Sequence, residues 1–70
     1  MTYAELTRRL KVLGVEFARP AGGSLELWWH PASGRTTIIP HHAGREIRRG
    51  PLAKILKDLG VNMQDLDRRG

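Results

Sequence analysis

The sequence predicts an α+β domain in which two helices cover one face of a three-stranded antiparallel sheet. Apolar residues recur at helical spacing near both ends of the chain, and three segments between them alternate or are rich in β-branched residues. The turns between these segments are short and contain Gly and Pro, which favours a meander of antiparallel strands. The apolar sides of the helices and of the sheet bury one another by packing into two layers.

A first helix is predicted over residues 3–13. Thr2 and Glu5 have the spacing of a capping box, in which each side chain accepts a hydrogen bond from the backbone N–H of the other residue. Gly14 fits the position directly after a helix. The apolar residues form one stripe at spacings of three, four and three: Tyr3, Leu6, Leu10 and Leu13.

Three strands are predicted over residues 15–19, 25–30 and 35–39, with turns at residues 20–23 and 31–34. The first strand alternates apolar and polar residues, and the third is rich in β-branched residues. Strands joined by turns this short pair with their neighbours in an antiparallel meander.

Trp28 and Trp29 are adjacent, so they point to opposite faces of the second strand. We assign Trp29, together with Leu25 and Leu27, to the face covered by the helices. Trp28 then lies on the open face, available to stack on a base or to meet a partner. Cross-strand packing is the alternative interpretation, and the face assignment is reversible because both faces of this strand are apolar.

A connecting loop at residues 40–50 leads to a second helix over residues 51–59. Pro51 suits the first helical position, where its missing N–H costs nothing, and Gly60 suits the position after the helix. The apolar stripe of this helix consists of Leu52, Ile55, Leu56 and Leu59. Asn62 and Asp65 are spaced to cap one further turn through Leu66.

The 70 residues are enough for one domain, residues 1–70, with a frayed tail at residues 67–70. The chain contains no cysteine, which excludes disulfides and thiolate metal sites and fits a reducing compartment. Its apolar stretches are too short to span a membrane, and its first residues lack the pattern of a secretory signal. We expect a cytoplasmic protein that is a monomer when free.

Twelve Lys and Arg against seven Asp and Glu give a formal charge of +5, and arginine outnumbers lysine nine to three. Most of these cations lie in two groups, at residues 8–11 and 45–57. The guanidinium group pairs well with phosphate oxygens, so nucleic acid is the expected partner class, ahead of a membrane surface. The alternative is a solvated basic surface without a specific ligand.

Several segments of the chain, taken in their order and spacing, resemble the HicA toxin family. The strongest is residues 40–60, where Pro40 and two histidines precede basic residues, Gly50 and an Ile-Leu-Lys-Asp ending. The others are residues 6–14, 17–19, 23–24, 30–31, 34–35 and 39–47, with Val61 at the end. HicA proteins are the RNA-cleaving half of a bacterial or archaeal toxin–antitoxin pair.

The resemblance implies a fold like the double-stranded-RNA-binding domain, metal-independent cleavage of messenger RNA, and a HicB-like antitoxin that blocks the active surface. It also implies a catalytic histidine directly after Gly23-Ser24, where this chain has Leu25. Leucine neither takes nor gives a proton. An engineered change, a natural loss, or transfer of the proton-handling role to another imidazole would each explain the leucine. We favour the first two, which predict a folded RNA binder with little or no cleavage.

Metal-free RNA cleavage needs a base near the 2′-hydroxyl and an acid near the leaving 5′-oxygen, and imidazole, with a pKa of about 6.5, suits both tasks. His41 and His42 are candidates for phosphate contact or for rescue of proton transfer, and RNA contact is favoured over catalysis; alternatively, they bond backbone groups near the helix. His30 is predicted as a polar strand-end residue on the wet face. Three histidines without an acidic cluster do not predict a metal site, and no cofactor is expected.

Arg45, Arg48 and Arg49 are the strongest phosphate candidates, because they flank a helix N-terminus whose dipole also favours anions. Solubility is the alternative explanation for these arginines. The complete set of expected RNA-binding residues is Ser24, Trp28, His41, His42, Arg45, Arg48 and Arg49.

Three functions therefore remain open on the sequence: a HicA-type messenger-RNA endonuclease impaired by Leu25, a non-catalytic RNA-binding module of the same shape, and a protein that only binds an acidic HicB-like antitoxin.

Overall fold

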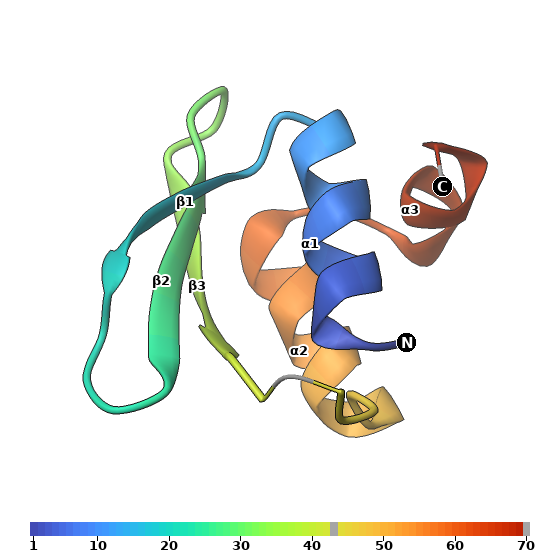
Figure 1. Ribbon diagram of the computed structural model, residues 1–70. Helices are drawn as coiled ribbons and strands as arrows, with labels where there is room; N and C mark the ends of the chain where they lie inside the picture. Colours follow the sequence, from blue (N-terminus) through green and yellow to red (C-terminus); the bar gives the residue numbers. More distant parts are fainter. Residues whose placement is uncertain (43, 70) are drawn as a thin grey trace.

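The computed structural model describes residues 1–42 and 44–69, so Ala43 of the family-like segment and Gly70 of the predicted tail lie outside the described residues. The chain forms three helices and three strands (Figure 1). In order they are α1 (Tyr3–Val12), β1 (Glu16–Pro20), β2 (Leu25–His30), β3 (Arg35–Pro40), α2 (Arg49–Leu59) and α3 (Met63–Arg69). The predicted α+β order is confirmed, with the short C-terminal helix present.

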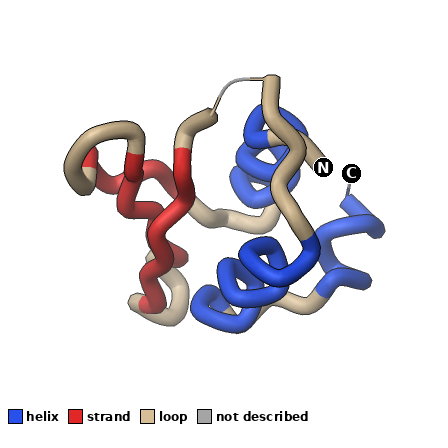
Figure 2. Tube along the Cα trace, turned by 90° about the horizontal axis from the view of Figure 1, so that it is seen from below, coloured by secondary structure: helices blue, strands red, loops and turns tan. Residues whose placement is uncertain are grey.

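The sheet has the order β1-β2-β3 with both pairs antiparallel, as predicted. Leu25 lies opposite Pro40 at one end of the β2–β3 ladder, and His30 lies opposite Arg35 at the other. The β1–β2 register shifts between Phe17 and Arg19. Figure 2 shows the helices on one side of the sheet, so the other face is left open. This two-layer arrangement is compatible with a double-stranded-RNA-binding-like fold.

The capping box predicted for α1 is confirmed. The Glu5 N–H donates to Thr2 Oγ1 at 3.3 Å, and the Thr2 N–H donates to Glu5 Oε1 at 3.2 Å. The helix ends at Val12, one residue before the predicted end, because Leu13 is the C-cap and leaves helical geometry.

The core forms between the helices and the inner face of the sheet. Its buried apolar residues are Leu6, Leu10, Val15, Trp28, Ile39, Leu52, Ile55, Leu56, Leu59, Val61 and Leu66. The apolar stripes predicted for both helices contribute most of these side chains, with Tyr3 and Leu13 packed partly buried at the margin.

The face assignment of β2 was wrong. Trp28 is 2% exposed and Trp29 is 37% exposed, so Trp28 faces the helices and is not available to stack on a base. Glu26 and His30 share the face of Trp28, and an added Cβ at Gly14 would lie 3.6 Å from His30 Nε2. The predicted position of His30 on the wet face is therefore also wrong. Alternation favoured the face with two leucines, but the helices cover the face on which Trp28 lies between Glu26 and His30.

α2 begins at Arg49, two residues before the predicted start at Pro51, with Arg48 as its N-cap. Pro51 is still within the first turn, whose N–H groups have no partner inside the helix. Gly60 ends the helix with φ +70°, a left-handed conformation that suits glycine.

α3 is longer than the single turn predicted through Leu66, because it continues to Arg69. Asn62 Oδ1 accepts the N–H of Asp65 at 2.8 Å, which confirms the predicted cap. Leu66 is fully buried, and Asp67 pairs with Arg9 of α1 at 3.1 Å. Residues 67–69, predicted as a tail, thus belong to α3, and the contact of Asp67 with Arg9 joins this helix to α1.

Within residues 1–42 and 44–69, no helix is both long enough and apolar enough to cross a membrane.

Candidate nucleic-acid interface

The loop between β3 and α2, residues 41–48, is here called the basic loop. Its first residue is fixed beside β2, because the His41 N–H donates to the Ser24 carbonyl at 2.7 Å. Near its other end, Glu46 forms a β-bridge with Thr2, and the Ile47 N–H donates to the Met1 carbonyl at 2.8 Å. Both ends of the basic loop are thus anchored to the folded domain.

Three basic side chains and one carboxylate of this loop meet in one depression of about 200 Å³. His42, Arg45 and Arg48 line it. The remaining lining residues are Pro40, Glu46, Ile47 and Pro51. The depression lies at the start of α2, whose first turn contains no acidic residue and whose N-cap side chain makes no capping hydrogen bond. Helix N–H groups and arginines at one point favour an anion such as a phosphate.

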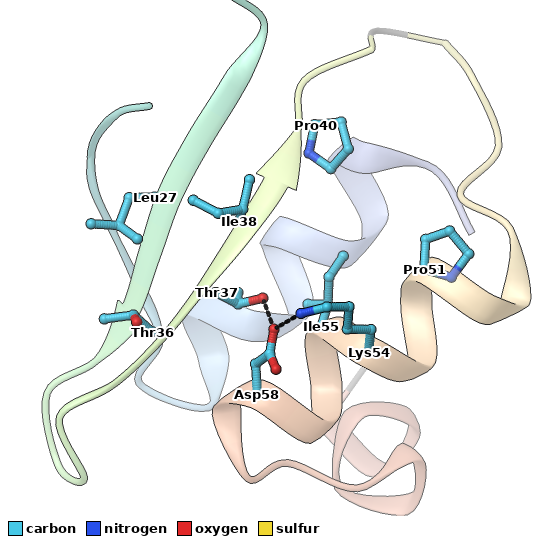
Figure 3. Close-up of a pocket in the computed structure, with 9 residues that line it drawn as sticks. All are labelled: Leu27, Thr36, Thr37, Ile38, Pro40, Pro51, Lys54, Ile55 and Asp58. Atoms are coloured by element: carbon cyan, nitrogen blue, oxygen red, sulfur yellow. Dashed lines mark hydrogen bonds and ion pairs between the residues drawn. The ribbon is translucent and has the colours of Figure 1, made fainter. Parts of the chain in front are cut away.

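A second groove of about 400 Å³ runs between β3 and α2 and shares Pro40 and Pro51 with the first (Figure 3). Lys54 lines it, but the Lys54 ammonium donates to Asp58 at 2.9 Å, and Thr37 donates to the same oxygen at 3.0 Å. The hydrogen bonds from Lys54 and Thr37 hold the pKa of Asp58 below its usual value. Lys54 is thus partly neutralised, so the stronger anion site is the depression beside the basic loop.

The other predicted site residues lie around this depression rather than in it. Ser24 is exposed and holds the basic loop through its carbonyl, and Arg49 is exposed at the first position of α2. Leu25 pairs with Pro40 and is 40% exposed on the face of the sheet away from the helices. Position 25 and the basic loop therefore lie at the same end of the sheet.

The basic side chains at residues 8–11 do not line the depression, and two of them contact other parts of the domain. Arg9 pairs with Asp67, and the Lys11 ammonium lies 5.8 Å from the centroid of the Trp28 ring. These cations support the packing of α1 on α3 and on β2, whereas Arg8 is exposed on α1.

Sequence reasoning missed a polar cluster formed by Tyr3, Glu26, Trp28 and His41, here called the Glu26 cluster. Glu26 Oε1 accepts hydrogen bonds from the Tyr3 hydroxyl at 2.5 Å and from the Trp28 indole N–H at 3.0 Å. Glu26 Oε2 lies 3.5 Å from His41 Nδ1. The Tyr3 and His41 rings stack with centroids 4.1 Å apart. The available signal was that Glu26 alternates onto the same face as Trp28.

Glu26 is ionised at neutral pH despite being largely covered. Burial raises its pKa, but the hydrogen bonds from Tyr3 and Trp28 and the charges of His41 and Lys11 outweigh burial, so the pKa lies below its usual value. Burial, the hydrogen bond to Glu26 and repulsion by its charge raise the pKa of Tyr3 to about 12. Tyr3 therefore remains a hydrogen-bond donor to a charged carboxylate.

In the described part of the chain, no group of three or more His, Cys, Asp and Glu residues is arranged to hold a metal ion.

Comparison with known proteins gives two matches. The family model described as "HicA toxin of bacterial toxin-antitoxin" matches residues 3–61. A protein of Pseudomonas fluorescens (strain Pf0-1) named "Probable mRNA interferase HicA" is 34% identical over 61 residues, which cover 87% of this chain and 97% of that protein. No solved structure matches the chain significantly.

Proposed function

This chain belongs to the HicA toxin family, and from that premise we propose that it is an endoribonuclease of a toxin–antitoxin pair whose cleavage of RNA is impaired by Leu25. The proposed substrate is messenger RNA, in keeping with the name of the Pseudomonas relative, and the proposed partner is a HicB-like antitoxin. The proposed site of action is the cytoplasm, where such a substrate and partner are expected.

The observation that carries this proposal is the meeting of His42, Arg45 and Arg48 at the N-terminus of α2, beside the end of β2 that holds Leu25. Arginine forks and free helix N–H groups are suited to the charged oxygens of a phosphate backbone. A strand of RNA bound there would pass next to position 25, because Leu25 pairs with Pro40, which lines the same depression.

RNA carries its own nucleophile, the 2′-hydroxyl, so the protein has to bind the phosphate and move protons. A well-placed acid or base is worth roughly 10²–10⁴-fold in rate. Because leucine does neither, its presence at position 25 costs about 3–5 kcal/mol of barrier relative to a histidine in the same place. No step of this proposal requires a metal ion.

The test is Leu25→His, with Leu25→Gln as a polar control that does not titrate. We expect Leu25→His to raise the rate of RNA cleavage by about 10²–10⁴-fold while RNA affinity changes little. Leu25 is 40% exposed, so neither substitution should unfold the domain. If the unmodified chain cleaves RNA as fast as Leu25→His does, then Leu25 does not impair cleavage.

A second candidate, binding of an antitoxin without RNA cleavage, is favoured by the open face of the sheet. Trp29 and Ile38 are 37% and 43% exposed there, on the same face as Leu25. Exposed apolar groups gathered on one face are typical of protein interaction sites. If this is the only function, RNA should bind no better than any other polyanion, and Leu25→His should add no cleavage.

A further inference from the structure

His41 is held on two sides by the fold. Its ring stacks on Tyr3 with an interplanar angle of 18°, and its Nδ1 lies 3.5 Å from Glu26 Oε2. A carboxylate attracts the N–H of an imidazole, so Glu26 favours the neutral tautomer with the proton on Nδ1 and the lone pair on Nε2. A base oriented by a third group in this way is the usual arrangement for proton transfer.

Glu26 is itself fixed, which distinguishes this pair from a chance surface contact. Two donors occupy Oε1, from Tyr3 and Trp28, and leave Oε2 directed toward His41. The Glu26 side chain is 18% exposed, whereas that of His41 is 47% exposed. The carboxylate is thus enclosed while the imidazole is open to a ligand.

The backbone of His41 lies beside the position where the proton-handling group is absent, although the His41 ring lies with Glu26 on the helix-covered side of the sheet and Leu25 faces the open side. The His41 backbone N–H bonds the carbonyl of Ser24, which directly precedes Leu25. Its neighbour His42 lines the depression together with Arg45 and Arg48. An RNA strand whose phosphate binds in that depression would have its adjoining ribose within the region of the His41 ring.

We propose that His41, oriented by Glu26 and Tyr3, is the base for the RNA cleavage that this chain retains. The inference rests on the proposed function, since it assigns a residue to the same reaction. His41 would be a catalytic residue, because its Nε2 contacts the ribose, and Glu26 and Tyr3 would be positioning residues.

In the proposed step, His41 Nε2 takes the proton of the ribose 2′-hydroxyl. The 2′-oxygen forms a bond to phosphorus, and the bond from phosphorus to the 5′-oxygen breaks. The leaving 5′-oxygen takes a proton from water, and His41 returns its proton to solvent. The products are a 2′,3′-cyclic phosphate and a free 5′-hydroxyl.

The test compares the full-length chain with His41→Gln on a single-stranded RNA substrate. Glutamine keeps a donor for Glu26 but does not take up a proton near neutral pH. We expect cleavage to fall by roughly 10²-fold or more, while RNA affinity and the melting temperature stay near those of the unmodified chain. His30→Gln is the matched control, because His30 lies at the other end of β2, and it should leave cleavage unchanged.

Chemical rescue supplies a readout that a structural role would not give. In His41→Ala, added imidazole should restore part of the lost cleavage, since a free base then enters the space left by the ring. Unchanged cleavage in His41→Gln would overturn the proposal. Loss of cleavage without rescue of a folded His41→Ala would also overturn it, because the ring would then be needed only for its packing.

The variant Leu25→His separates this inference from the proposed function. Cleavage by Leu25→His together with none by the unmodified chain would leave the function standing and reject His41 as a base. Absence of cleavage in both proteins would reject the endoribonuclease function, and the inference with it. Cleavage that depends on His41 in the unmodified chain but not in Leu25→His would support the assignment.

Discussion

At the scale of one residue, Tyr3 both packs against the core and supports the candidate site. It is the single tyrosine of the chain and the first residue of α1, with its ring partly buried against the core. Its hydroxyl donates at 2.5 Å to Glu26, and its ring stacks on His41. Tyr3 thus connects the N-terminal helix, β2 and the basic loop at one point.

A direct test at this scale is an ultraviolet titration, which measures the ionisation of the Tyr3 hydroxyl alone. The midpoint should lie at about 12, compared with 10.0 for an ordinary tyrosine, because the folded state disfavours the phenolate. Because the pKa of Tyr3 is raised in the folded state, its neutral hydroxyl stabilises the folded protein fully below pH 10.0. This contribution is lost as the pH rises toward about 12.

The companion variant is Glu26→Gln, which removes the charge that repels the phenolate. Its tyrosine should titrate at lower pH, and unfolding in denaturant should bring the midpoint of both proteins to the ordinary value. A folded protein whose tyrosine already titrates at 10.0 would contradict the hydrogen bond between Tyr3 and Glu26.

At the scale of the elements, α3 is the clearest case of a short helix held by packing. A helix of seven residues is not stable alone, and two contacts attach it to α1. The pair between Arg9 and Asp67 is exposed on the Asp67 side, so it is worth about 1 kcal/mol at most. Leu66 is fully buried, and burial of its side chain is the larger contribution.

Leu66→Ala should therefore lower the free energy of unfolding by about 2–5 kcal/mol, as other buried leucines do. Asp67→Asn should lower it by less than about 1 kcal/mol. Urea denaturation of both variants measures the difference. Equal losses would contradict this ranking, because the ion pair would then stabilise α3 as much as the burial of Leu66.

The same elements show which features of the fold are readable from sequence. The capping box of Thr2 and Glu5 and the stripe through Leu52 and Leu59 are local patterns, and local patterns sufficed to place α1 and α2. The faces of β2 were not readable, because each face contains a tryptophan and the face with Leu25 and Leu27 is the one that the helices leave open. Packing against α1 decides between them, and that depends on the whole fold.

The Glu26 cluster could not be predicted from the sequence, for a similar reason. Glu26 and His41 are separated in sequence, and their approach depends on the β2–β3 register and on the course of the basic loop. The arginines of that loop were readable, since charge beside a predicted helix start is a local signal. Position 25 was identified only through the family resemblance.

For the whole molecule, the distribution of charge matters more than its sum of +5. Arg45 and Arg48 meet beside the N-terminus of α2, whereas Arg9 and Lys11 are used within the fold. The binding of RNA by such a protein releases counterions, so affinity falls as salt concentration rises. The slope of that dependence reports how many phosphates the cations neutralise.

The double variant Arg45→Ala with Arg48→Ala should weaken RNA binding and reduce the salt slope by about 1.4, since each contact with single-stranded RNA contributes about 0.7. Fluorescence anisotropy at several salt concentrations measures both quantities. The matched control is Arg8→Ala with Arg68→Ala, which removes the same charge from exposed positions on α1 and α3. Equal slopes in the two double variants would indicate diffuse attraction without a defined phosphate site.

The opposite burial of Trp28 and Trp29 equips the protein with two built-in optical probes. Emission from Trp28 reports whether the interior is intact, and emission from Trp29 responds to whatever covers the outer sheet surface. In Trp29→Phe, a docking antitoxin should leave the emission spectrum unaltered, whereas in the unmodified chain it should shift the spectrum to the blue. Intrinsic tryptophan fluorescence, without an added dye, would then show which side of the molecule a partner occupies.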